Sequence, residues 1–252
     1  MTIILRPGTP ADAAACGPIC YEAFKAVAEV DGRIVGSNFL DERAPVVGLG
    51  PITVDPRVQN KGVGARLMQD AIDRTARQKA AGLRLLQSAF HNRSLCLYTR
   101  LGFHTREPVS VLQGPALGRT FPGYAVRRAT PADVAACNRL CHQVHGFARD
   151  GEVRDAIGQK SATVVEHLER IVGYSTGIAF FAHSVAETNQ GLMALIAAAP
   201  AFGGPGFLLP TRNHEVFAWC LEAGLRLVFQ MTLMTTGLYN EPKGAWLPSV
   251  LY

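Results

Sequence analysis

The chain has 252 residues, of which 48% are hydrophobic and 18% are charged. This much apolar material can build a core, which excludes a wholly disordered chain, and the length suits one or two domains. The formal charge of +5 suits a small polyanionic ligand. Because no run of Lys or Arg is longer than two residues, the charge gives little support for a nucleic-acid partner.

The predicted elements begin with a short strand over residues 2–6. This run ends at Pro7 and is too short for a signal peptide. A helix is predicted over residues 10–26. Two apolar runs, 27–31 and 33–40, flank Asp31 and Gly32, a pair typical of a tight hairpin.

The rest of the first half alternates strands and helices. Residues 46–54 are predicted to form a strand, and residues 62–80 have the apolar spacing of an amphipathic helix. A strand at 83–89, a helix at 92–101 closed by Gly102, and a strand at 103–113 follow. The first half is therefore expected to be an α/β unit with a mixed sheet.

The second half repeats features of the first. Thr9 and Pro10 recur 121 residues later as Thr130 and Pro131, and Gly102 matches Gly224 at a spacing of 122. In each copy the Thr-Pro pair is typical of a helix start, with Thr as N-cap and Pro at the first position. The sequence thus predicts two tandem domains, residues 1–114 and 125–252, joined by a turn-rich linker at 115–124. Each domain is expected to be a central mixed sheet flanked by helices.

Neither a membrane helix nor a disulfide scaffold is expected. The apolar stretch over 177–210 is interrupted by polar residues and by two prolines. Six cysteines are few for this length. The repeated pairs Cys16/Cys20 and Cys137/Cys141 are expected to be buried apolar residues, and no metal site is predicted.

The most informative segment is the turn before the predicted helix at 62–80. Gly62 and Gly64 allow the backbone to approach a ligand closely. A helix start also leaves several N–H groups without intrahelical partners, which together with the charge of Lys61 would form an anion site. An ordinary glycine-rich turn is the alternative.

These residues resemble the signature of the GCN5-related N-acetyltransferase (GNAT) superfamily. The run Gln59-Asn60-Lys61-Gly62-Val63-Gly64 is similar to the Gln/Arg-x-x-Gly-x-Gly/Ala motif, and Asn92, Tyr98 and Leu101-Gly102-Phe103 resemble a later block. The resemblance implies acetyl-CoA as co-substrate, with its pyrophosphate on the glycine loop and its pantetheine arm along a strand backbone. The implied contacts are Ile52, Thr53, Val54, Gln59, Asn60, Lys61, Gly62, Val63, Gly64, Ala65 and Asn92. Asn92 lies one residue closer to Tyr98 than in the commonest family pattern.

The resemblance also implies a role for Tyr98, as the acid that protonates the departing thiolate. Packing against the sheet is the alternative. A general base is not evident, because the strand at 46–54 has no acidic residue. Glu42 is a candidate base, a solvated turn is the simpler interpretation of Glu42, and deprotonation through water is equally open.

Two departures from the family pattern limit the prediction. The helix at 10–26 runs directly into the next strand, where family members have a second helix. Either the acceptor side is unusually open or a segment between residues 26 and 27 is absent from the chain. At a spacing of 121, loop 59–64 falls on residues 180–185, which lack the glycine motif, and Tyr98 corresponds to Cys220. The second copy is therefore predicted to be degenerate, either lining the acceptor cleft or purely structural.

The expected function is acetyl transfer from acetyl-CoA to a primary amine, on a small molecule or a peptide, at a single site in the first domain. A non-catalytic sensor of CoA or acyl-CoA is one alternative, and a nucleotide-phosphate binder is another. We expect a cytoplasmic protein without nucleic-acid or membrane partners. A homodimer is compatible with the sequence.

Overall fold

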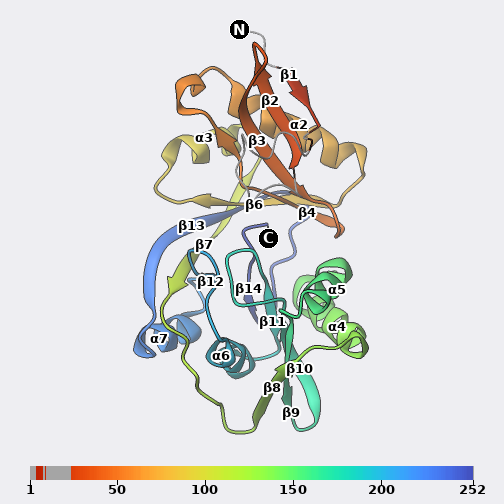
Figure 1. The fold of residues 1–252 in the computed structure, drawn as a ribbon, viewed down its shortest axis with the longest axis vertical. Coiled ribbons are helices and arrows are strands. Elements are labelled where there is room, and N and C mark those ends of the chain that lie inside the picture. The colour runs from red at the N-terminus through yellow and green to blue at the C-terminus, as the bar shows by residue number, and fades with distance from the viewer. Residues whose placement is uncertain (1–3, 8, 10–23, 252) are drawn as a thin grey trace.

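The computed structural model describes residues 4–7, 9 and 24–251 (Figure 1). Within these residues the chain forms a nine-stranded sheet and a five-stranded sheet, both flanked by helices. The fold is the mixed α/β architecture expected from the sequence. Of the helices in the described part, none is both long and apolar enough to cross a membrane.

The first half opens with β1 (Ile4–Arg6), β2 (Phe24–Val30) and β3 (Arg33–Asp41). As predicted, β2 and β3 form a hairpin that turns at Asp31 and Gly32, both with positive φ. The predicted helix over residues 10–26 is wrong over residues 24–26, because β2 pairs with β3 from Phe24 onward. The remainder of that prediction, residues 10–23, lies outside the described residues. Residues 26 and 27 are consecutive within β2.

The glycine loop and its neighbours follow in the predicted order. They are β4 (Val46–Leu49), β5 (Thr53–Val54), the short 3-10 helix η3 (Pro56–Val58), α2 (Val63–Arg77), β6 (Gly82–Ser88), α3 (Asn92–Arg100) and β7 (His104–Gln113). The face of α2 with Leu67, Met68 and Ala71 is fully buried. Helical spacing places these residues on one side, toward the sheet.

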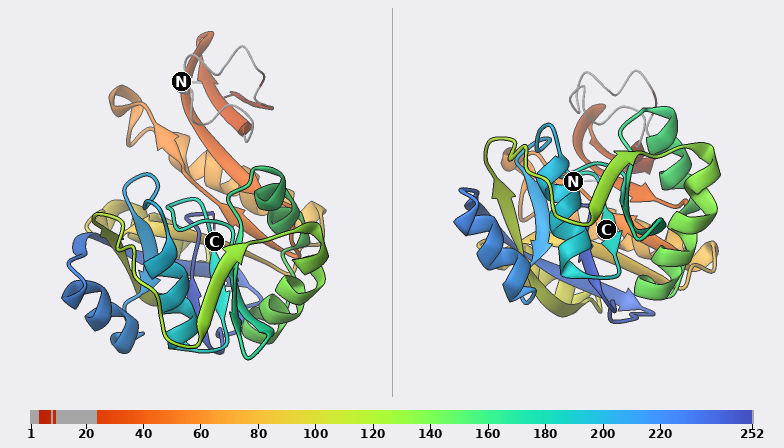
Figure 2. Two further views of the ribbon diagram at one scale, coloured as in Figure 1. Left: turned by 60° about the horizontal axis from the view of Figure 1, so that its bottom comes forward. Right: turned by 90° about the horizontal axis from the view of Figure 1, so that it is seen from below.

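The second half repeats most of this order, without a counterpart of β5 and with an additional last strand. Its elements are β8 (Tyr124–Arg128), η4 (Pro131–Asp133), α4 (Val134–His145), α5 (Asp150–Gly158), β9 (Thr163–His167), β10 (Arg170–Ser175), β11 (Ser184–Ala186), α6 (Asn189–Ala198), β12 (Phe207–Pro210), α7 (His214–Glu222), β13 (Arg226–Gly237) and β14 (Ala245–Leu247). Helices α4 and α6 pack on opposite faces of the five-stranded sheet (Figure 2). Between β8 and β9 lie 34 residues, against 17 between β1 and β2, so the connection is shorter in the first half.

The two halves exchange strands. β13 lies between β6 and β7 and pairs antiparallel with both, so that Leu233 is opposite Leu86 on one side and Glu107 on the other. In turn, β12 adds to the outer edge of β7. The nine-stranded sheet therefore contains strands from both sides of the predicted linker at 115–124, so each half provides strands that pair with the other half (Figure 1).

A buried cation also joins the halves. Arg84 of β6 is fully buried, and its guanidinium lies 5.5 Å from the ring centre of Phe147 and 5.3 Å from that of Tyr239. Both rings come from the second half. Such cation–π contacts strengthen when they are withdrawn from water, so this arginine contributes to the junction.

Candidate functional site

A cleft of about 1110 Å³ opens where β4 and β6 separate. The two strands are parallel neighbours from Val46 and Gly82 to Leu49 and Leu85. Beyond Leu49 the chain turns at Gly50, whose φ of +141° favours glycine, and β5 then pairs with β3 while β6 continues beside β13. The strand predicted over residues 46–54 is therefore two strands, and the break between them forms the cleft.

The start of α2 faces this cleft. Gly62 is the N-cap, with a φ of +86°, and no described side chain caps the helix. A Cβ on Gly62 would meet nothing within 4 Å, so the backbone conformation rather than space favours glycine. Val63, Gly64 and Ala65 line the cleft, and their N–H groups lie in the first turn, where intrahelical partners are lacking. This geometry fits an anion, as the sequence predicts.

Arg93 tethers the loop that precedes this helix start. Its guanidinium donates to Gln59 Oε1 and to Asn60 Oδ1, both at 2.6 Å. Gln59, Asn60 and Gly62 also line the cleft, whereas Lys61 is exposed and lies outside its lining. Sequence reasoning missed Arg93. The sequence does contain an indication of its role. An arginine in the first turn of a helix is unfavourable because of the helix dipole, which suggests that Arg93 has a binding role instead.

Tyr98 and Asn92 reach the cleft from α3. The Tyr98 ring packs 6.2 Å from that of Phe103, measured between ring centres. Burial raises the pKa of the Tyr98 phenol, which keeps the hydroxyl protonated at neutral pH and available as a proton donor. Asn92 is exposed at the first position of α3.

The backbone of β5 supplies the edge along the cleft. Thr53 and Val54 pair with Ser37 and Gly36 of β3 on one side, and together with Ile52 they line the cleft. The Thr53 hydroxyl lies 2.8 Å from that of Ser37, which anchors the strand.

Glu42 is placed away from the cleft, which argues against its prediction as a base. Its carboxylate accepts hydrogen bonds from both Nε and Nη2 of Arg74 and from Gln78 Nε2. Arg74 and Gln78 hold this carboxylate at the C-terminal end of α2, and Glu42 is not among the residues that line the cleft. Among the described residues that line the cleft there is no Asp or Glu.

The second half closes the other side of the same cleft. Phe180, Met231 and Val250 line it, and the backbone N–H of Val250 donates to the Phe180 carbonyl at 2.9 Å. Three residues of the second half therefore reach the candidate site, and its contribution to an acceptor cleft stays a prediction.

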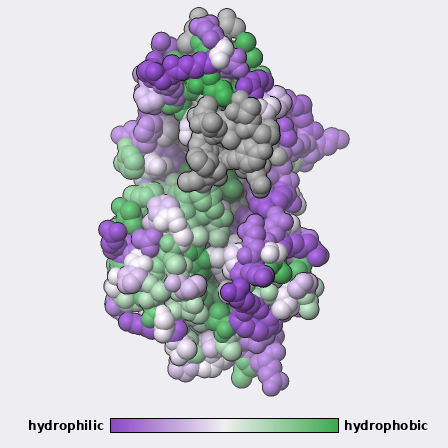
Figure 3. Space-filling model, viewed as in Figure 1, coloured by the Kyte–Doolittle hydropathy of each residue, from purple (hydrophilic) through white to green (hydrophobic). Residues whose placement is uncertain are grey.

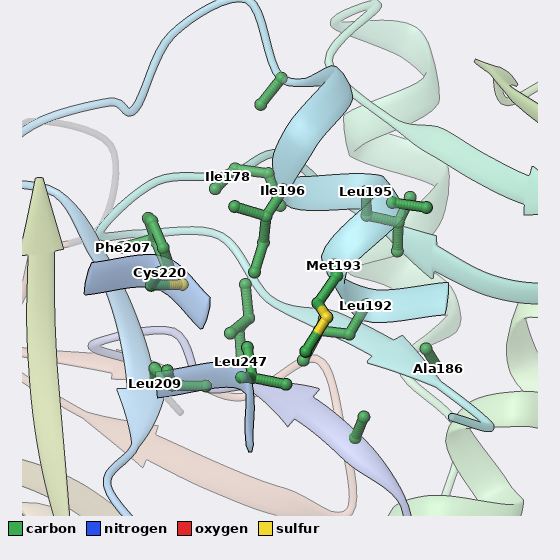
Figure 4. Packing of buried hydrophobic residues seen from close by; sticks show 14 of the residues in the cluster. Ile178, Ala186, Leu192, Met193, Leu195, Ile196, Phe207, Leu209, Cys220 and Leu247 are labelled. Carbon is green, nitrogen blue, oxygen red and sulfur yellow. The ribbon is translucent and has the colours of Figure 1, made fainter. Parts of the chain in front are cut away.

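The corresponding place in the second half is filled by its own chain. There β11 and β12 take the positions of β4 and β6, and β14 pairs antiparallel with β11, with Leu247 opposite Ser184. β14 also contacts β12. Cys220, at the position that matches Tyr98, is buried in an apolar cluster with Leu209 and Leu247 (Figure 4), and burial raises its thiol pKa to about 12.

Where the first half has a basic residue beside the predicted pyrophosphate site, the second half has an acidic residue at the matching position. Glu215 holds the position in α7 that Arg93 holds in α3, and its carboxylate accepts from Asn189 at 2.6 Å and Gln190 at 3.3 Å. Because α6 begins at Asn189, the counterpart of the glycine loop lies just before that residue, so the predicted match to residues 180–185 is wrong. The cause is that connection lengths differ between the halves.

No metal centre is evident in the described part of the chain, where no three His, Cys, Asp or Glu side chains are grouped to hold an ion. Cys137 and Cys141 are residues of α4 and are buried in the core. Cys16 and Cys20 lie outside the described residues.

Parallel strands that diverge beside an uncapped helix start give this α/β fold a cleft that fits a phosphate-bearing ligand. Residues 22–105 match the family model described as the acetyltransferase (GNAT) domain, so this part of the chain is a GNAT domain, as the sequence predicts. This match supports acetyl transfer as the general activity.

Solved structures share the fold over almost the whole chain. An acetyltransferase-type protein from Pyrococcus horikoshii is 15% identical, with a TM-score of 0.75, and the match covers 96% of this chain and 91% of that one. A GCN5-related N-acetyltransferase from Sphaerobacter thermophilus is 13% identical, with a TM-score of 0.61 and coverages of 96% and 97%. A tandem GNAT protein from the clavulanic acid biosynthesis pathway is 14% identical, with a TM-score of 0.54 and coverages of 94% and 98%. A search of curated proteins found no match.

Proposed function

We propose that this chain is an acetyl-CoA-dependent N-acetyltransferase with one active site, in the cleft between β5 and β6. The observation that supports it most is the uncapped start of α2 beside the loop tethered by Arg93. The N–H groups of Val63, Gly64 and Ala65 would bind the pyrophosphate, and the exposed edge of Ile52 to Val54 would pair with the pantetheine arm.

Acetyl-CoA supplies the activated acetyl group, and the residues of the cleft assist the proton transfers that accompany its transfer. The amine nitrogen replaces sulfur on the acetyl carbon, so the amine loses a proton and the sulfur gains one. Tyr98, whose phenol pKa is raised by burial, donates the proton to sulfur. The amine releases its proton to water, because no described carboxylate lines the cleft. General acid assistance of this kind is worth about 10²–10⁴-fold.

The second half supports a single site. The strand β14 fills the place where a pantetheine arm would lie, and Glu215 replaces the cation that Arg93 provides in the first half. A carboxylate at this point repels a pyrophosphate. We therefore expect one molecule of CoA to bind per chain.

The test is calorimetric titration with CoA together with thiol release from acetyl-CoA over a panel of amines. One CoA bound per chain, with amine-dependent thiol release, is the expected result. Two bound CoA molecules would contradict the single site. CoA binding without turnover on any amine would favour the sensor, and a larger melting shift with ATP than with CoA would favour a nucleotide-phosphate binder.

A further inference from the structure

Part of the cleft wall belongs to the second half, beside the end of β6, where Met231 pairs with Ser88. Phe180, Met231 and Val250 form it. Phe180 is held edge-on by Phe181, with ring centres 5.6 Å apart, and it lies 6.4 Å from the ring of Phe229. The hydrogen bond from Val250 to the Phe180 carbonyl fixes the wall further. This surface is therefore built before any acceptor binds.

The chemistry of this wall is apolar. Its three side chains carry no charge, and the described lining of the whole cleft contains no carboxylate. Two other phenylalanine side chains are exposed to solvent. Phe90, which lines the cleft, is 75% exposed, and Phe181, the residue after Phe180, is 48% exposed. On the face drawn in Figure 3, hydrophobic side chains also gather near the middle of the molecule. Exposed apolar groups beside a cleft commonly mark a ligand surface.

We propose, on the basis of the function proposed above, that the acceptor is an aralkyl monoamine. Its apolar body packs chiefly on the partly buried Phe180, beside the largely buried Met231 and Val250, and its amine points toward Tyr98. A polyamine or a basic peptide would bring a second ammonium against this wall, where no described carboxylate compensates for the loss of water. A small hydroxylated amine would leave the aromatic surface unused.

The test compares phenethylamine, ethanolamine and putrescine at saturating acetyl-CoA. We expect kcat/KM for phenethylamine to exceed that of the other two by about tenfold or more, which corresponds to burial of one phenyl ring. Equal or better turnover of putrescine or ethanolamine would overturn this inference and leave the proposed function intact. No thiol release with any amine would overturn the proposed function, and this inference with it.

Variants at Phe180 assign the preference to the wall. Phe180→Ala should raise the KM for phenethylamine about tenfold and should raise the KM for ethanolamine less, because ethanolamine has no ring to pack on this side chain. Phe180→Leu keeps apolar volume, protects folding and should give a smaller rise. Phe180→Glu should shift the preference toward putrescine. The control Leu221→Ala removes an exposed apolar side chain on α7, outside the cleft lining, and should change none of these values. An unchanged KM for phenethylamine in both Phe180→Leu and Phe180→Glu would contradict the assignment.

Discussion

The phenol of Tyr98 lies among apolar side chains on the cleft side of α3, and we propose it as the proton donor. We expect Tyr98→Phe to lower kcat about 100-fold and to leave the affinity for CoA unchanged, because only the hydroxyl is removed. Thiol release and calorimetry would measure the two quantities. Since burial raises the phenol pKa, protonation of this group should not limit the rate of the unaltered protein near neutral pH. A variant with wild-type kcat would restrict Tyr98 to packing.

Arg93 combines a tether with a charge. In Arg93→Gln the two hydrogen bonds to Gln59 and Asn60 are lost together with a cation near the predicted pyrophosphate site. We expect the Kd for CoA to rise about 10- to 100-fold, the range for lost charge-assisted hydrogen bonds.

The matched control for this prediction is Arg77→Gln. Arg77 ends α2, at the opposite end of the helix from the cleft, and its replacement removes the same charge from the molecule. Calorimetry should show wild-type affinity for this control. Equal weakening in both variants would mean that overall charge, and not the tether, determines binding.

At the scale of elements, the short strand β14 is expected to contribute strongly to the stability of the second half. Leu247 is 2% exposed and packs with Leu209 and Cys220 in the cluster of Figure 4. Leu247→Ala should lower the free energy of unfolding by about 2–5 kcal/mol, the usual cost of such a truncation in a core. Urea denaturation measures this change. Leu238→Ala, at a 48% exposed position just after β13, should cost less than about 0.5 kcal/mol.

Local pattern predicts most individual elements of this chain. The Asp31-Gly32 hairpin, the apolar stripe of α2 and the glycine that closes α3 all depend on neighbours within a few residues, and each matches the structure closely. The helix predicted through residues 24–26 fails because pairing with β3 overrides local propensity.

Long-range pairing leaves no such local signal. β7 and β13 each have the pattern of a last strand of their own half, and nothing in that pattern indicates that they lie side by side. For the same reason, the sequence does not indicate that Phe180 and Val250 line the cleft, because they are distant in the chain from its other residues. The glycine loop and Tyr98 are visible because their chemistry requires residues at short, fixed spacings, whereas Arg93 acts on a loop more than 30 residues away.

At the scale of the whole molecule, a buried cluster of polar side chains in the second half makes stability depend on pH. Glu152 accepts from Arg149 at 2.7 Å and lies 3.0 Å from His183 Nδ1, while His183 Nε2 lies 2.9 Å from the Tyr174 hydroxyl. Burial, together with the nearby charge of Arg149, lowers the pKa of both His183 and His145 below the ordinary value of 6.5. Burial alone would raise the pKa of Glu152, but Arg149 and His183 outweigh it and hold that pKa low.

These shifts predict a loss of stability in acid. Below pH 6.5 the unfolded chain binds protons at histidines that stay neutral in the folded protein, so the free energy of unfolding should fall as the pH drops from 7 to 5. Urea denaturation at several pH values would measure this slope. His183→Gln should flatten it, whereas His104→Gln, at an exposed position of β7, should not. A slope independent of His183 would contradict this explanation.

The strand exchange has a consequence for any cut in the chain. A break within residues 115–123 would give two fragments, each lacking a strand that the other provides. Unpaired strand edges seek a partner, so the fragments should be insoluble alone and should reassemble when they are produced together. Recovery of thiol-releasing activity from the co-produced pair would show this complementation. The covalent link between the halves would then be dispensable, since the shared sheet itself keeps them together.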